Sequence, residues 1–144
     1  MKKNGIVTAV FIVLISCMGY AQKIDSAAIP KIVWNGMFDT YPVTYVYPVT
    51  WTKEGSLYKG QLTLMEKPAF ALIDSTGRLI RKERLFPEFH LPKQIKNEMT
   101  TKYPGYKIKE IYQFTDDKGK ETYKITFQFE QTTIYNPDGT PAAK

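Results

Sequence analysis

The sequence predicts an α+β fold of two tandem repeats, each with one helix followed by an antiparallel meander of three or four strands. Two observations lead to this prediction. The chain from residue 29 onward repeats its own pattern about sixty positions later, and each copy changes from helical to alternating apolar periodicity. Halves of this size have little core of their own, so we expect their sheets to join, with both helices on one face.

The repeat is visible in residues that recur at a fixed spacing. The pairs separated by 62 positions are Ile29 and Leu91, Pro30 and Pro92, Lys31 and Lys93, Asn35 and Asn97, Met37 and Met99, Tyr41 and Tyr103, Pro42 and Pro104, and Gly77 and Gly139. Tyr58 and Tyr123 are 65 apart, which a longer loop in the second copy explains. The sequence therefore divides into repeat 1 with its linker, residues 22–86, and repeat 2, residues 87–144.

Residues 1–21 have the pattern of a signal peptide. Two lysines precede an apolar segment over residues 6–17, and small residues lead up to Ala21. The apolar segment is shorter than the roughly 20 residues of a transmembrane helix, so we expect no stable membrane span in the mature protein. Cleavage after Ala21 is one interpretation, a lipoprotein signal that lipidates Cys17 is a second, and a retained N-terminal anchor is the third. All three predict export, to the periplasm or the medium in the first case and to a lipid anchor in the second.

Export changes the composition of the folded chain. Cys17 is the only cysteine, so a chain cleaved after Ala21 has no disulfide and no thiol. The net charge is +6 for the whole sequence and +4 without the two lysines at the N-terminus, with both signs interspersed. Such a surface lacks the clustered basic residues of a nucleic-acid groove, and we expect no nucleic-acid partner.

Two helices are predicted, over residues 31–41 and 92–102. Each begins at or directly after a proline, which suits the first helical turn, and each ends at a Tyr-Pro pair, because the residue before proline disfavours helix. In the second helix Ile95 and Met99 continue an apolar stripe at a spacing of four. Gly36 weakens the first helix by about 1 kcal/mol relative to alanine.

The clearest strands alternate between apolar and polar residues, over 58–65 in the first copy and 122–130 in the second. The apolar set of each should face the core. The predicted core of the second half is Ile95, Met99, Tyr123, Ile125, Phe127 and Phe129. Alternation in the preceding strand breaks at Glu110, and the aligned residue of the first copy is Pro48, which predicts a β-bulge in both halves.

Shorter strands complete each meander. Third strands are expected over residues 70–74 and 132–136, and each runs into a turn that ends in glycine. Residues 79–82 and those after 140 are candidates for fourth strands. The segment 84–90 would then link the two halves.

At this point the residues resemble a known family. The pattern consists of Leu91-Pro92-(x)2-Ile95-(x)7-Tyr103-Pro104-Gly105-Tyr106-Lys107-Ile108, then Gly119-Lys120-(x)2-Tyr123, then Asp138-Gly139. Its order and spacing resemble the PepSY-like, or β-lactamase-inhibitor-like, family of small exported bacterial proteins built of tandem repeats. The resemblance covers residues 91–139 well and residues 29–77 more weakly. It implies a curved sheet that presents a binding face, and inhibition only by analogy of fold.

The residue inventory does not indicate an enzyme. The single histidine, His90, precedes the second helix without a nucleophile or an orienting partner in sequence. The acidic residues of the turns are placed to cap the backbone, so no metal site is expected. Glycine-rich phosphate or dinucleotide motifs are missing from the sequence, and we expect no cofactor.

The sequence points instead to the sheet face away from the helices as a binding surface. By alternation its candidate residues are Lys59, Gln61, Thr63, Lys124, Thr126 and Gln128, and the irregular first strands add Trp51 and Tyr112 as candidates. Tyrosine and tryptophan provide large contact area at low entropic cost, although Trp51 also fits a core position. Two functions follow: recognition of another envelope or secreted protein, as an inhibitor or accessory factor, or binding of a small ligand between the repeats. An apolar pocket at the repeat junction would favour the second.

Overall fold

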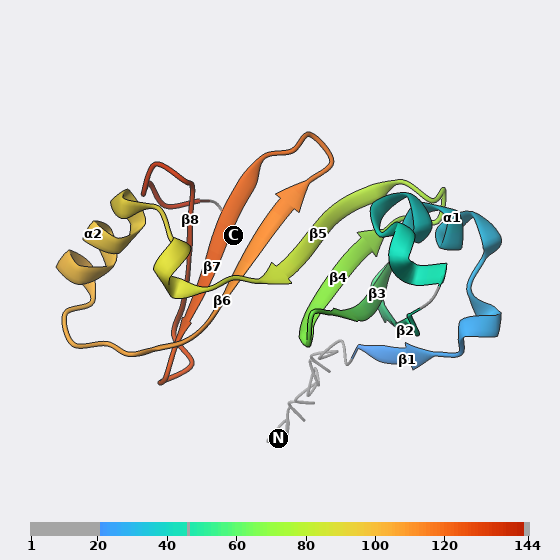
Figure 1. Cartoon of the computed structure of the whole chain (residues 1–144), viewed down its shortest axis with the longest axis horizontal. Coiled ribbons are helices and arrows are strands. Elements are labelled where there is room, and N and C mark those ends of the chain that lie inside the picture. Colours follow the sequence, from blue (N-terminus) through green and yellow to red (C-terminus); the bar gives the residue numbers. More distant parts are fainter. Residues whose placement is uncertain (1–20, 46, 143–144) are drawn as a thin grey trace, which may run out of the picture.

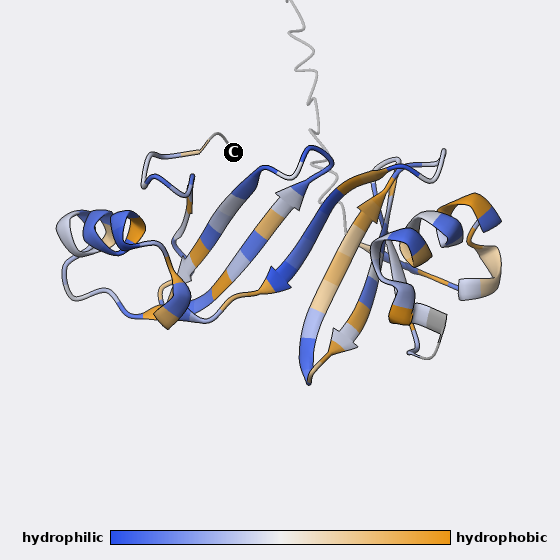
Figure 2. Cartoon of the chain, turned by 45° about the horizontal axis from the view of Figure 1, so that its top comes forward, coloured by the Kyte–Doolittle hydropathy of each residue, from blue (hydrophilic) through white to orange (hydrophobic). Residues whose placement is uncertain are grey.

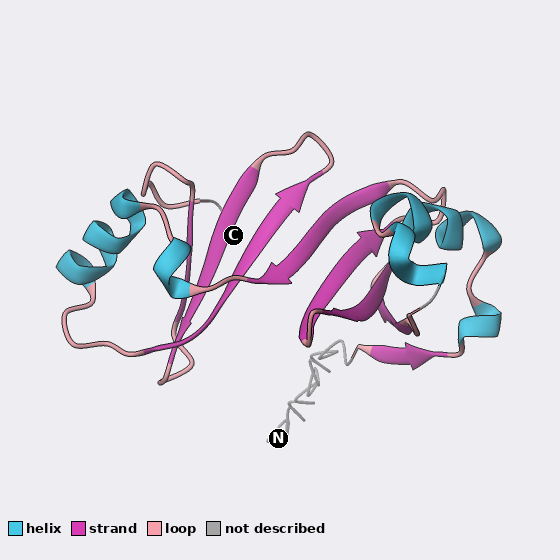
Figure 3. Ribbon diagram, viewed as in Figure 1, coloured by secondary structure: helices cyan, strands magenta, loops and turns pink. Residues whose placement is uncertain are grey.

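The computed structural model describes residues 21–45 and 47–142, so the predicted signal peptide lies outside the described residues apart from Ala21. One antiparallel sheet of eight strands, in the order β1 to β8, carries two α-helices (Figures 1 and 3). The elements are β1 Gln22–Ile24, α1 Lys31–Thr40, β2 Thr50–Glu54, β3 Leu57–Leu64, β4 Lys67–Ile73, β5 Leu79–Leu85, α2 Lys93–Lys102, β6 Ile108–Asp116, β7 Glu121–Phe127 and β8 Thr132–Tyr135. Short 3-10 turns span Ser26–Ala28, Pro42–Tyr45 and Glu88–His90.

Both predicted helices are confirmed to within one residue at each end. Each follows a proline, and each closes with the backbone N–H of its final tyrosine donating to the carbonyl four residues earlier. Tyr41 N donates to Met37 O, and Tyr103 N donates to Met99 O, both at 2.8 Å. The helices lie at opposite ends of the long axis of the molecule (Figure 1).

The two helices pack on the same face of the sheet, each over its own core. The first core consists of Ile29, Val33, Met37, Val49, Trp51, Leu62, Ala69, Ala71 and Ile73. The second consists of Leu91, Ile95, Ile111, Tyr123, Ile125, Phe127 and Tyr135. Ala69 of the first core and Tyr123 of the second core are connected by directly paired residues, Arg84 and Gln113. Directly paired residues of neighbouring strands point to the same face, so both cores lie on one face of the sheet. The predicted fold class is therefore confirmed.

Two turns pack against the helices at matched positions. Gly77 and Gly139 both adopt φ +83°. A Cβ atom on Gly77 would lie 2.4 Å from Ile32 O, and one on Gly139 would lie 3.0 Å from Gln94 O. Each turn and its helical partner are again 62 residues from their counterparts. These contacts support the predicted duplication, which stays a prediction.

Strand β5 joins the two halves directly. It pairs with β4 on one side and β6 on the other and continues to Leu85, so the prediction that residues 84–90 form a linker is wrong for its first two residues. Figure 2 shows β5 as hydrophilic over most of its length, beside the more hydrophobic β4. Pairing on both sides satisfies the backbone N–H and C=O groups of β5, which compensates for its weak strand propensity.

The predicted core position of Phe129 is wrong. Strand β7 ends at Phe127, whose N–H donates to Gln131 O at 2.9 Å and closes a tight turn. Glu130 takes φ +62° within this turn, and Phe129 is left 82% exposed. The remaining predicted core residues of the second half are buried or pack against the core.

The predicted bulge is present in one half. Pairing of β6 with β7 shifts between Ile108 and Glu110, which confirms the bulge in the second half. In the first half Pro48 lies before β2, and β2 pairs with β3 without interruption, so that bulge prediction is wrong. At the described residues 141–142, pairing consists of a single bridge between Tyr135 and Pro141 rather than a strand.

Candidate functional site

The face of the sheet opposite the helices, called the open face below, has an aromatic and charged centre. Strand pairing aligns Phe70 of β4 with Glu83 of β5 and Phe114 of β6, and aligns Tyr112 of β6 with Lys124 of β7. These residues surround a hollow of about 200 Å³. The central cluster consists of Lys59, Phe70, Glu83, Tyr112, Phe114 and Lys124. It takes side chains from both halves of the chain.

Charges and rings are interleaved in the central cluster. Lys59 Nζ lies 4.7 Å from the centre of the Phe70 ring and 3.4 Å from a carboxylate oxygen of Glu83. The Glu83 side chain is only 7% exposed, and its other carboxylate oxygen accepts from Arg81 Nε at 2.9 Å. The Phe70 and Tyr112 rings lie 6.1 Å apart. A buried carboxylate bonded to two cations fixes the rings and charges beside it, so the cluster is largely preorganised.

Lys124 differs from the other cations of this face. It is half-buried at the hollow, and among the described residues it forms neither a hydrogen bond nor an ion pair. Burial, together with the negative charges of Glu110 and Glu83, raises the pKa of neighbouring Tyr112, which therefore stays neutral at physiological pH. The cluster thus offers a free ammonium group beside neutral aromatic surface.

Three predicted site residues meet in the central cluster: Lys59, Lys124 and Tyr112. Gln61 and Thr63 follow Lys59 along β3 and are exposed beyond the hollow. Thr126 lies on β7 but is 6% exposed, which leaves it little contact area.

Trp51 and Gln128 are corrections to the predicted surface. Trp51 is fully buried in the first core, opposite Gly60 and 5.1 Å from the Trp34 ring centre, because its position in the pairing faces α1. Gln128 follows the end of β7 and lies in the β7–β8 turn rather than on the open face. Lys59, a predicted residue of this surface, forms ion pairs with Glu54 at 3.2 Å and with Glu83.

Sequence reasoning missed Phe70, Glu83 and Phe114. A local signal existed for Phe70, since it alternates with Ala69 and Ala71, whose small side chains suit close helix packing. For Glu83 and Phe114, the missing information was the pairing of β5 with β4 and β6. That pairing is set by tertiary structure.

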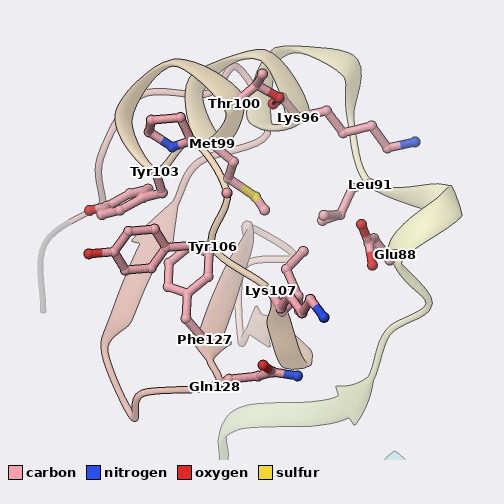
Figure 4. Close-up of a pocket in the computed structure, with 13 residues that line it drawn as sticks. Glu88, Leu91, Lys96, Met99, Thr100, Tyr103, Tyr106, Lys107, Phe127 and Gln128 are labelled. Carbon is pink, nitrogen blue, oxygen red and sulfur yellow. Dashed lines mark hydrogen bonds between the residues drawn. The ribbon is translucent and has the colours of Figure 1, made fainter.

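A second concave region lies between α2 and the start of β6 (Figure 4). This α2 groove has a volume of about 610 Å³. Its wall includes Leu91, Met99 and Phe127, while Glu88 and Lys107 lie at its rim (Figure 4). Its apolar residues belong mainly to the second core or pack against it.

A third hollow lies at the junction of the two halves, on the helix-bearing face. This junction hollow has a volume of about 270 Å³, and its lining combines polar and apolar groups. The lining residues are Tyr41, Leu64, Ala69, Lys82, Arg84, Gln113, Thr115 and Glu121. Burial raises the pKa of Tyr41 to about 12, so this hydroxyl is neutral, and it donates to Phe70 O at 3.3 Å. The junction therefore has a hollow of mixed polar and apolar character rather than the purely apolar pocket that would favour the small-ligand function.

The described part of the chain shows neither a metal-binding cluster nor a membrane-spanning helix. Within residues 21–45 and 47–142, no cluster of three or more histidine, cysteine, aspartate or glutamate side chains has the arrangement of a metal site. Over the same residues, no helix has the length and apolar character needed to cross a membrane.

Comparison with known proteins identifies the architecture through structure rather than sequence. No family model matches the chain, and no curated protein matches its sequence. A DUF2874 family protein from Bacteroides uniformis has a TM-score of 0.69 at 13% identity, over 79% of this chain and 86% of that one. A candidate periplasmic protein from Bacteroides eggerthii also has a TM-score of 0.69, at 12% identity, over 87% and 88%.

A BLIP-like protein from Bacteroides fragilis has a TM-score of 0.64 at 10% identity, over 79% of this chain and 83% of that one. Identities this low establish a likeness of fold and carry no function with them. The matches cover most of both chains, so the likeness of fold is not confined to one half. The chain therefore has the fold of the DUF2874, or PepSY-like, and BLIP-like proteins of Bacteroides.

Proposed function

We propose that this chain is an exported, non-enzymatic binding protein that recognises another envelope or secreted protein through its open face. The observation that carries the proposal is the central cluster, in which aromatic rings from both halves surround a hollow beside a free lysine. Rigid aromatic side chains next to a desolvated charge are typical of interface hot spots. The N-terminal signal pattern and the candidate periplasmic fold neighbour support export.

The charges of the open face indicate what the partner presents. Glu83 is already bound by Lys59 and Arg81, whereas Lys124 has no acidic partner among the described residues. A carboxylate from a partner would therefore pair with Lys124, next to apolar side chains that cover Phe70 and Tyr112. Pairing of a half-buried lysine in this way contributes to specificity and to association rate.

The test is capture from the envelope fraction with the mature protein as bait, followed by binding measurements with the purified partner. Lys124→Glu and Tyr112→Ala should each weaken binding about tenfold or more, since truncation of a hot-spot residue costs about 2 kcal/mol or more. Lys93→Glu, on an exposed position of α2, makes the same charge change away from the open face and serves as the control.

Lys59 is a poor choice for the first variant. Lys59→Glu would place a third carboxylate beside Glu54 and the buried Glu83, so a loss of binding could reflect a loss of folding. Unchanged affinity in both Lys124→Glu and Tyr112→Ala, with intact melting curves, would show that the open face is not the contact surface.

A further inference from the structure

The junction hollow has a feature that binding through the open face does not use. Lys82 and Arg84 are alternate residues of β5, so both project to the helix-bearing face, separated by two strand residues or roughly 6.6 Å. Among the described residues, Lys82 forms no ion pair or hydrogen bond, and the only hydrogen bond that the Arg84 side chain donates comes from its Nε. The Arg84 guanidinium carbon also lies 5.7 Å from the centre of the Phe86 ring, which leaves the terminal N–H groups without a hydrogen-bond partner among these residues. The terminal nitrogens of Arg84 and the Lys82 ammonium are thus available to a ligand.

Arg84 is held in place by a chain of buried groups. Its Nε donates to Gln113 Oε1 at 2.6 Å, and Gln113 Nε2 donates to Tyr123 Oη at 3.2 Å. The Tyr123 hydroxyl donates in turn to Glu121 at 3.3 Å. Gln113 and Tyr123 are 4% and 5% exposed, so the chain is fixed within the sheet. It orients the guanidinium group at little further entropic cost when a ligand binds.

The other lining groups limit the ligand further. Tyr41 and Gln113 have their polar atoms engaged with protein partners, while Leu64 and Ala69 provide an apolar wall. Two cations against the single acid Glu121 leave one positive charge in the hollow. Its volume of about 270 Å³ lies just below the range of about 300–1,000 Å³ that is common for small-molecule sites.

We propose that the junction hollow binds a small monocarboxylate with a short apolar body. The carboxylate lies between Lys82 and Arg84, where the planar guanidinium group donates two parallel hydrogen bonds, and the apolar part lies against Leu64 and Ala69. This site is on the face opposite the proposed protein-binding surface and does not depend on it.

The test uses benzoate as the probe and benzamide as its neutral isostere, titrated into the isotopically labelled mature protein. The side-chain resonances of Arg84 Nε–H and Gln113 Nε2–H report binding by NMR. Benzoate should shift both with saturation, and benzamide should not. Lys82→Gln and Arg84→Gln should each weaken binding about tenfold or more, while Lys93→Gln, which removes an equal charge elsewhere, should not.

A variant that is expected to strengthen benzoate binding distinguishes an effect on the site from a general loss of structure. Glu121→Gln keeps an acceptor for the Tyr123 hydroxyl but removes the negative charge from the hollow, so it should tighten benzoate binding several-fold. Three results would overturn the proposal: no saturable shift with benzoate, equal binding of benzamide, or unchanged binding in Lys82→Gln, an exposed substitution that leaves the fold intact. Saturable binding of inorganic phosphate without binding of benzoate would overturn the assignment to a carboxylate.

Discussion

Substitution of Gly36 by alanine gives opposite expectations from sequence and from structure. In an ordinary helix interior the change stabilises by about 1 kcal/mol, because alanine restricts the unfolded chain and favours helix. In this structure, a Cβ atom on Gly36 would lie 2.1 Å from Gly77 O, 3.0 Å from Gly77 C and 3.2 Å from Ile73 Cγ2. The first distance is more than 1 Å shorter than an ordinary contact, and the atom that it meets is backbone.

Helix α1 must therefore move away from the β4–β5 turn to accommodate a methyl group. Such movement loosens the contacts of Val33 and Met37, which are both fully buried on the same helix. Overpacking of this kind costs about 1–3 kcal/mol, and contact with rigid backbone places it at the upper end. After subtraction of the helix-propensity gain, we expect Gly36→Ala to lower the free energy of unfolding by about 2 kcal/mol.

The measurement is urea unfolding of the mature protein followed by circular dichroism, with the m-value checked for constancy. Asn35→Ala is the matched control, because Asn35 is the exposed neighbour on the same helix and its substitution reports propensity alone. That variant should be as stable as the parent or slightly more stable. If Gly36→Ala is also at least as stable as the parent, the close approach of α1 to Gly77 is not present in solution.

Three further predictions follow from burial and hydrogen bonding. Phe127→Ala should cost about 3–5 kcal/mol and leave the domain barely folded, whereas Phe129→Ala, at an 82% exposed position, should melt like the parent; equal effects would refute the β7 boundary. A hydrogen bond from the Thr76 side chain is the main cause that lowers the pKa of Asp74 to about 2. The ionised Asp74 carboxylate therefore stabilises the fold fully above pH ~4, and this stabilisation is lost as the pH falls towards ~2. In Asp74→Asn, the free energy of unfolding should depend less on pH in that interval than it does in the parent. Burial raises the pKa of Tyr41 to about 12, above the value of about 10 in the unfolded chain, so stability should fall from pH ~10 to ~12 in the parent and less in Tyr41→Phe, as alkaline melting curves would show.

Local chemistry was sufficient to predict the two helices. Proline at the start, a Tyr-Pro pair at the end and an apolar stripe between them act within one element, and the structure places both helices within one residue of the prediction. The same holds for the glycine turns at Gly77 and Gly139, where φ is positive. Each of these signals depends on neighbours within a few positions, which the sequence displays directly.

Alternation predicted the inward face of the strands but not their ends. Phe127 and Phe129 differ by one alternation step, yet one is in the core and the other is in solvent. The difference arises because β7 pairs with β8 only as far as the turn closed by Phe127 and Gln131. The position of a hairpin turn depends on which of several possible pairings with the partner strand is most stable. The sequence of one strand alone therefore does not determine where the strand ends.

The candidate site separates the two contributions most clearly. The sequence by itself placed Lys59 and Lys124 on the polar faces of their own strands, because alternation is a property of a single strand, and it offered Tyr112 as a candidate from an irregular strand. Tertiary structure alone brought them around one hollow, buried Trp51, and added Phe70, Glu83 and Phe114, since these outcomes depend on how β5 pairs across the two halves. The sequence of one strand does not specify its register with the neighbouring strands. That register is set by the packing of two cores and their helices on a common sheet.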